Sequence, residues 1–95
     1  MTVLEVLKAA RARIEDPARW CQYEMFGPGD ACCAIGAVYD VSLNVRARDR
    51  ARQRMDAAAC RLFDGIGAAR VNDRYGHAAV LQVFDAAIAD EEARS

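Results

Sequence analysis

The stretch "VRARDRARQRMDAAACRLF", residues 45–63, decides the fold because it predicts the longest helix in the sequence. It contains neither proline nor glycine, the two residues that most disfavour a helix interior. Small or apolar side chains recur in it every three or four residues, which is the spacing of one helix face. They are Ala47, Ala51, Met55, Ala58 and Leu62. We expect one long helix here, with Ser42 or Asn44 as its N-cap residue.

The start of the chain predicts a first helix. Thr2 and Glu5 have the spacing of a capping box, and apolar side chains follow at helical intervals over Val3–Glu15. Pro17 then favours a new turn, because the residue before a proline avoids helical geometry while proline itself suits a first helical position. That turn carries Trp20, the only tryptophan, which we expect to anchor the core.

The main loop lies between this helix and the next. The stretch "QYEMFGPGD", residues 22–30, contains two glycines and a proline and predicts an irregular connection. Asp30 at its end is a favoured N-cap residue type. We therefore expect a short helix over Ala31–Val41.

Beyond the long helix, Asn72 or Asp73 is expected to begin the last helix, which reaches about Glu92. The stretch "ARVN", residues 69–72, is the only short strand candidate. The sequence thus predicts an all-α fold, a compact bundle of about four helices, in a single domain of residues 1–95. An irregular loop separates the first helix from the second.

Composition and charge indicate one cytoplasmic domain. Ninety-five residues with 54% hydrophobic content suffice for a single core. The N-terminus has no long apolar run, so we expect no secretory signal, a reducing compartment and free thiols. The net charge of −1 argues against a general nucleic-acid binder, but residues 42–61 carry six basic and two acidic groups between acidic flanks. We expect the flanks to neutralise this middle segment within one fold.

Two adjacent cysteines stand in the stretch "GDACCAIGAVYD", residues 29–40. With Asp30 as N-cap, Cys32 and Cys33 fall in the first helical turn, where free amides and the helix dipole stabilise a thiolate. Cys33 is then a candidate nucleophile with a histidine base and an Asn or Asp to orient that base. The candidate catalytic set is Cys33, His77, Asn72 and Asp73.

Cys33 also suits close packing in the core, and we favour this interpretation over a nucleophile. Cys33, Gly36 and Ala37 place small side chains on one face, which lets another helix approach closely, and unpaired cysteine is among the most buried residue types. A zinc site is a weaker interpretation, because the possible ligands include no Cys-x-x-Cys pair. Those ligands are Cys21, Cys32, Cys33, Cys60 and His77. We predict no metal and no cofactor.

The arginines of the long helix fall on two sides, at about 100° per residue. One group forms a solvated ridge suited to a phosphate or an acidic partner: Arg46, Arg50, Arg54 and Arg61. Arg48 and Arg52 lie opposite, among the small core-facing side chains, so they must meet carboxylates or lie at the core's edge. We expect Glu15 and Asp16 to pair with them, so that all four residues are structural. Trp20 and Gly36 are also expected to be structural.

Three adjacent carboxylates, Asp90, Glu91 and Glu92, stand near the end of the last helix. The helix dipole disfavours negative charge there, so we expect this tail to fray. It is either a solubility feature or an acidic patch for a basic partner.

The blocks "IEDPARWCQ", "CAIGA", "VND" and "GHAAVLQVFDAAI" occur in this order across nearly the whole chain. With them the chain resembles a bacterial and bacteriophage family of small proteins catalogued as domain of unknown function 6197. The matching positions are Ile14, Glu15, Asp16, Pro17, Trp20, Gln22, Cys33, Ala34, Gly36, Ala37, Asn72, Asp73, His77, Val80 and Leu81. The chain departs from the family pattern at Tyr23, where the family tends to have Gly, and at Cys32 and Val71, where it has Trp. The resemblance implies a helical fold and a bacterial or phage origin, and it brings no established activity.

These observations favour a non-enzymatic binding or regulatory protein that acts by protein–protein contact. Resemblance and charge layout together suggest an inhibitor of a host nucleic-acid-handling complex, of the anti-CRISPR type, that uses the acidic residues 90–92. Two alternatives stay open. One is a cysteine-dependent hydrolase or transferase built on Cys33 and His77. The other is a nucleic-acid-binding module on the Arg46–Arg61 helix, whose affinity would fall steeply with salt.

Overall fold

The first helix begins where its capping box predicts. In the computed structural model, which describes residues 1–94, Thr2 Oγ1 accepts the Glu5 N–H at 3.1 Å and Glu5 Oε1 accepts the Thr2 N–H at 2.8 Å. These two bonds satisfy amides that the first turn leaves open. α1 then runs over Val3–Arg13 and ends close to the predicted boundary.

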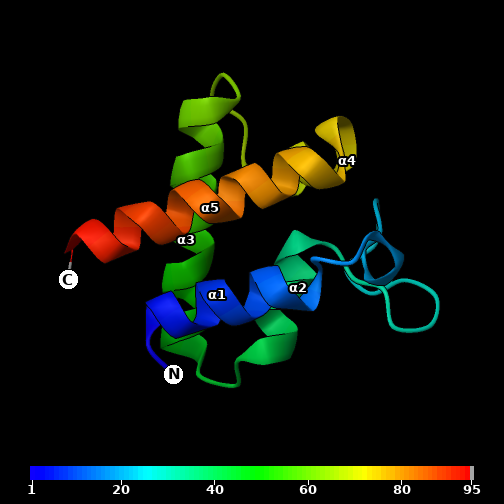
Figure 1. The fold of residues 1–95 in the computed structure, drawn as a ribbon, viewed down its shortest axis with the longest axis horizontal. Coiled ribbons are helices and arrows are strands. Elements are labelled where there is room, and N and C mark those ends of the chain that lie inside the picture. The colour runs from blue at the N-terminus through cyan, green and yellow to red at the C-terminus, as the bar shows by residue number, and fades with distance from the viewer. Residues whose placement is uncertain (95) are drawn as a thin grey trace.

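The long helix α3, Val45–Leu62, starts at Asn44, whose Oδ1 accepts the Ala47 N–H at 2.9 Å. Its predicted face is buried at four of the five expected positions, namely Ala47, Ala51, Met55 and Ala58. Leu62 is the exception. It is exposed, because the last turn of α3 extends past the helix that crosses it (Figure 1). The five-position stripe was therefore correct up to its final turn.

The end of the chain folds differently from the prediction. Asn72 and Asp73 do not begin the last helix, because they lie inside a separate short helix, α4, Ala68–Tyr75. This helix also contains the stretch expected as a possible strand. Gly76 then has a φ of 96°, a conformation that favours glycine, and it separates α4 from α5, His77–Arg94.

The all-α class is confirmed, but the count of about four is low. Over residues 1–94 the chain forms five α-helices and one 3₁₀ turn. The remaining helix, α2, spans Ala34–Val41, and the turn, η1, spans Pro17–Arg19 as the proline predicts. No helix in the described part of the chain is both long and apolar enough to cross a membrane.

The helices enclose one core. α1 and α5 pack against each other, and both cross α3 (Figure 1). Small alanine side chains on α3 let the helices approach closely at these crossings. The largest fully buried side chains of the core include Leu7, Ile14, Met55 and Phe84.

The irregular connection between α1 and α2 is present as predicted, and it lies at one end of the bundle (Figure 1). It covers residues 14–33 and includes η1. Trp20 follows that turn and packs, half-buried, against the core. This end of the molecule brings together the residues described next.

Candidate functional site

The loop between η1 and α2, residues 20–33, is folded back on itself. Its two ends pair through the Cys32 N–H to Arg19 O and the Cys21 N–H to Cys32 O, each at 3.1 Å. Its tip is closed by the Gly27 N–H, which donates to Ala31 O at 2.9 Å. Because these backbone groups are paired, the loop has a defined shape.

Asn72, a residue of α4, anchors this loop through its side chain. Its side chain is fully buried, and its Oδ1 accepts the Trp20 Nε1–H at 2.7 Å and the Ala34 N–H at 3.0 Å. Its Nδ2 donates to Cys21 O at 3.1 Å and to Asp73 Oδ1 at 3.0 Å. All the donors and the acceptor lone pairs of the amide are therefore used within the chain. Asn72, which was considered as the residue that orients a catalytic base, is thus an anchor that joins α4, the loop and the start of α2.

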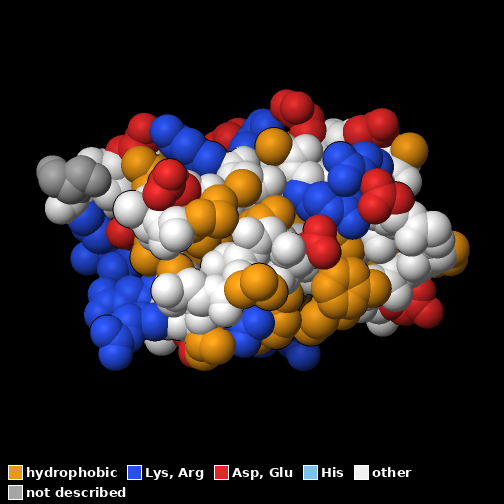
Figure 2. Space-filling view, turned by 90° about the horizontal axis from the view of Figure 1, so that it is seen from below, with side chains coloured by type: hydrophobic (Ala, Val, Ile, Leu, Met, Phe, Trp, Pro, Cys, Tyr) orange, Lys and Arg blue, Asp and Glu red, His pale blue; other side chains and the backbone are white. Residues whose placement is uncertain are grey.

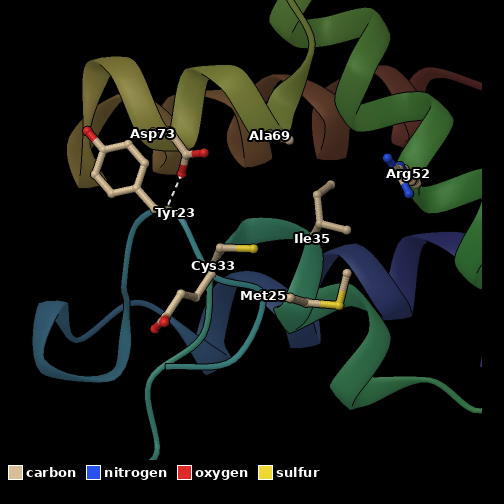
Figure 3. A pocket seen from close by; sticks show the side chains of 8 residues that line it. Tyr23, Met25, Cys33, Ile35, Arg52, Ala69 and Asp73 are labelled. Carbon is tan, nitrogen blue, oxygen red and sulfur yellow. Dashed lines mark hydrogen bonds between the residues drawn. The ribbon is translucent and has the colours of Figure 1, made fainter. Parts of the chain in front are cut away.

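Asp73 fixes the exposed part of the loop. Its Oδ1 accepts the Tyr23 N–H at 2.8 Å (Figure 3). Gln22 reinforces this contact, because its Nε2 donates to Asn72 O at 3.2 Å and to Asp73 O at 3.0 Å. Asn72 and Asp73, which were expected to begin the last helix, instead hold residues 22 and 23 of the loop.

Tyr23 has an unusual backbone conformation. Its φ is 69°, in the left-handed region that a bulky residue adopts only at an energetic cost. Its side chain is nevertheless 76% exposed. Tyr23 was not among the predicted site residues. A signal was present, because the family that the chain resembles tends to have Gly at this position, and Gly is the residue that a positive φ favours.

The helix that contains the candidate nucleophile begins later than predicted. The N-cap of α2 is Cys33, not Asp30, and Cys33 Sγ accepts the Gly36 N–H at 3.3 Å. Asp30 does not cap a helix, because the Cys32 N–H donates to Arg19 O and the Cys33 N–H donates to Met25 O. Its carboxylate instead binds Arg13 at 3.2 Å and Arg19 at 2.8 Å. Cys33 is therefore at the helix N-terminus as expected, but as the cap itself.

The thiols around this helix start are in different environments. Cys33 is buried, with 8% of its surface exposed, and Cys32 is fully buried. Burial raises the pKa of Cys32 to about 11, and burial also raises the pKa of the half-buried Cys21. Cys60, near the end of α3, is exposed and lies apart from the loop. Cys32 is thus a packing residue that stays protonated at neutral pH.

Gly36 has the structural role that was expected, with a different neighbour. A Cβ at this position would collide with the carbonyl oxygen of Met25. At Gly36, the small-residue face of α2 therefore receives the backbone of the loop. The Cys33 N–H donates to the same Met25 carbonyl at 3.1 Å, which ties the two segments together.

A pocket of about 210 Å³ lies between the loop, α2, α3 and α4 (Figure 3). Carboxylates lie on its loop and α4 sides, and one arginine of α3 lies on the other. Its lining residues are Tyr23, Glu24, Met25, Cys33, Ile35, Arg52, Ala69 and Asp73. The pocket therefore has a mixed lining in which the Cys33 thiol takes part.

His77 is not among the residues that line this pocket. It is the first residue of α5, and its Nε2 lies 2.7 Å from Ile14 O. Because a carbonyl only accepts, Nε2 carries a proton and donates this hydrogen bond. The ring also packs against Trp20, with centroids 5.2 Å apart. Within residues 1–94 no hydrogen bond joins His77 to Cys33 or to Asn72, and the histidine links the end of α1 to α5.

The acidic end of α5 is paired within the molecule. Glu91 contacts Arg54 at 2.9 Å, Asp90 contacts Arg61 at 3.0 Å and Glu92 contacts Lys8 at 3.6 Å. Residues 90–92 are helical, so the expected fraying there is wrong. The expectation that acidic flanks neutralise the basic middle segment is confirmed for Arg54 and Arg61.

The two inward arginines of α3 have an aromatic partner. The guanidinium of Arg48 lies over the ring of Tyr39, 4.5 Å from its centroid, and Arg52 Nη1 donates to the Tyr39 hydroxyl at 3.1 Å. The predicted pairing with Glu15 and Asp16 is wrong. Glu15 binds Arg11 at 3.1 Å, and Asp16 caps η1 by accepting the Ala18 N–H at 2.9 Å. Arg48 is half-buried at the core's edge, the other option the sequence left open, whereas Arg52 is exposed.

The possible zinc ligands do not converge. Over residues 1–94 no group of three or more His, Cys, Asp or Glu side chains is arranged to hold a metal ion.

The chain belongs to DUF6197, a family of unknown function whose profile matches residues 1–90. No curated protein and no solved structure gives a significant match to it.

Proposed function

We propose that this DUF6197 protein is a non-enzymatic binding protein that inhibits or regulates a partner protein through direct contact. The contact is made by the loop tip, residues 22–27. The observation that supports this most is Tyr23, an exposed aromatic side chain on a strained backbone that a buried polar network holds in place.

The strain supports a functional role because a left-handed conformation for a bulky residue costs about 1–2 kcal/mol. Such a conformation persists only where the surrounding structure enforces it. Here Asp73 binds the Tyr23 N–H, and Asn72 fixes both Asp73 and Cys21. A loop built in this way loses little conformational entropy when it binds, which favours affinity.

The exposed chemistry of the loop tip suits a protein partner. Met25 and Phe26 are exposed beside Tyr23, so three large apolar side chains lie close together in the chain. Tyrosine is enriched among the residues that contribute most to protein interfaces. We infer a partner with an apolar cleft that receives Tyr23.

The role as an inhibitor of a nucleic-acid-handling complex remains part of this proposal, with a different contact surface. Asp90, Glu91 and Glu92 were expected to fill a basic groove, but each binds a cation of its own chain. The apolar side chains of the loop tip, Tyr23, Met25 and Phe26, are instead exposed. We therefore assign the contact to the loop.

Affinity capture with matched variants tests this proposal. The tagged protein is recovered from a bacterial lysate as wild type, as Tyr23→Ala and as Leu62→Ala. Leu62 is also an exposed apolar residue, but it lies at the far end of α3. We expect one partner to be recovered with wild type and Leu62→Ala and to be reduced at least about tenfold with Tyr23→Ala, as for an interface hot spot. Equal recovery with both variants would refute the role of the loop.

A cysteine-dependent hydrolase or transferase is the second candidate, because the Cys33 thiol caps a helix and lines a pocket. The two candidates differ in thiol reactivity. A nucleophilic Cys33 would be alkylated by iodoacetamide before Cys60 at neutral pH, despite its burial. The binding protein we propose would react first at the exposed Cys60, and at Cys33 only after unfolding. Mass spectrometry of the modified peptides distinguishes these orders.

A further inference from the structure

The arginine ridge of α3 is divided by the ion pairs of α5. Arg54 and Arg61 are bound by carboxylates, whereas Arg46 and Arg50 are exposed. Among residues 1–94 no carboxylate lies within ion-pair distance of either Arg46 or Arg50. Two guanidinium groups one helical turn apart are thus left without the neutralisation that the rest of the ridge receives.

These two arginines stand between two hollows of the surface. Both line a hollow of about 550 Å³ on α3, together with Val45, Asp49 and Gln53. Both also line a second hollow of about 250 Å³ that faces the N-terminus, together with Met1 and Val3. Figure 2 shows Lys and Arg side chains gathered at one end of the lower face, with hydrophobic side chains beside them.

Exposed apolar groups accompany this charge. Leu43, in the connection before α3, is 95% exposed, and Val45 and Met1 are also exposed. A surface that combines unpaired arginines with apolar side chains is complementary to a segment that carries both carboxylates and apolar side chains. We propose that the surface of Arg46, Arg50 and Val45 binds an acidic, apolar-containing segment of a partner protein. This surface lies on a different element from the loop tip and goes beyond the function proposed above.

A nucleic acid suits this surface less well. Its affinity depends on the number of phosphates neutralised, and the structure leaves only two arginines of the ridge for that purpose. The apolar side chains in the hollows beside them, Val45, Met1 and Val3, offer nothing to a phosphate backbone. Carboxylates and phosphates can both form two hydrogen bonds to a guanidinium group, so the apolar side chain of a peptide, which would fill a hollow, is what favours a protein segment.

Peptide binding tests the proposal on the intact protein. The probe is a fluorescein-labelled peptide of Glu-Glu-Leu-Glu repeats, measured by fluorescence anisotropy at low salt. Comparison probes have Ser in place of Leu, or Lys in place of Glu, and a short DNA duplex is the fourth ligand. We expect the Glu-Leu peptide to bind most tightly and its affinity to fall about tenfold in the double variant Arg46→Glu, Arg50→Glu.

A matched double variant controls for net charge. Arg70→Glu, Arg94→Glu changes the charge equally at two other exposed arginines and is expected to leave the peptide affinity within about twofold. All variants carry exposed substitutions, and circular dichroism confirms that they fold. The proposal is overturned if the peptide does not bind, if both double variants weaken it equally, or if the duplex binds more tightly. Tyr23→Ala should leave this affinity unchanged, so failure here is distinct from failure of the loop proposal.

Discussion

Tyr23 is the residue at which the backbone departs most from what its side chain prefers. Its positive φ is enforced by Asp73, and its ring is exposed and not packed into the core. Where a position requires a left-handed backbone, glycine adopts it at no steric cost. The strain at Tyr23 therefore has no structural benefit within the chain.

Replacing Tyr23 with Gly should raise the free energy of unfolding by about 1 kcal/mol, because the left-handed conformation is then unstrained. Urea denaturation followed by circular dichroism measures this change. Tyr23→Ala is the control, since it removes the ring and keeps the Cβ that causes the strain. If Ala and Gly give the same stability, the backbone at this position is not strained.

Cys32 contributes a pH dependence of stability. Its pKa in the folded protein is about 11, above its ordinary value of 9.0, because burial disfavours the thiolate. A raised pKa means that the Cys32 thiol keeps its proton up to a higher pH in the folded state than in the unfolded state. The stabilisation is complete below about pH 9 and is lost as the pH rises through 11.

Stability measured by urea denaturation between pH 8 and 11 should therefore decline more steeply in the wild type than in Cys32→Ala. Cys60→Ala provides the control, because Cys60 is exposed and its removal should leave the wild-type slope. An identical slope in all three proteins would contradict the burial of the Cys32 thiol.

At the scale of elements, the contact that positions the loop is the close approach of α2 to residue 25. Gly36 makes it possible, because any Cβ there meets the Met25 carbonyl. The Cys33 N–H donates to the same carbonyl, so the start of α2 and the loop are held as one unit. The loop tip depends on this unit for its position.

Gly36→Ala should destabilise the protein by about 2 kcal/mol, since the loop must move away from α2. The displacement should also weaken the Trp20 Nε1 bond to Asn72 and shift the tryptophan fluorescence to longer wavelength. Thermal unfolding and an emission spectrum measure both effects. A variant with unchanged stability and emission would show that the helix and the loop are not in close contact.

Local signals in the sequence predicted the elements whose ends are determined locally. The capping box of α1, Pro17 at η1 and Asn44 at α3 all act on residues within three positions. α4 was missed because its first amide is capped from another helix, by Asp56 Oδ1, which accepts the Ala68 N–H at 2.9 Å. Asp30 failed as an N-cap for a similar reason, since the carbonyls of Arg19 and Met25 accept the N–H groups of Cys32 and Cys33.

The candidate site was predictable only in part. Cys33 was correctly expected at a helix start, but cysteine is not a usual N-cap residue, so its role as the cap was not foreseen. The contacts of Asn72 and Asp73 with the loop connect residues about fifty positions apart. No local pattern encodes such contacts, because they depend on how the helices pack.

For the whole molecule, the main electrostatic feature is the pairing of carboxylates at the end of α5 with arginines of the basic helix α3. The acidic end of α5 lies against the basic helix α3 and leaves only the first turns of α3 unneutralised. The most enclosed of the pairs at that end is Arg54–Glu91, with side chains 22% and 19% exposed. Ion pairs that are shielded in this way contribute more than those in full solvent.

Arg54→Gln should lower the free energy of unfolding by about 1 kcal/mol, whereas Lys8→Gln should change it by less than about 0.5 kcal/mol. The Lys8–Glu92 pair is longer, at 3.6 Å, and both of its side chains are more than half exposed. Chemical denaturation of the two variants in parallel measures the difference. Equal effects would indicate that the α3–α5 contact does not shield its charges.

We propose above that the protein contacts its partner through the loop tip that carries Tyr23. The most direct measurement places the photo-crosslinking residue benzoylphenylalanine at position 23 or, in a second protein, at position 62, and irradiates cells that produce each one. We expect one discrete cross-linked partner from position 23, competed away by excess wild-type protein but not by Tyr23→Ala, and no such product from position 62. The same products from both positions, or none from position 23, would contradict it.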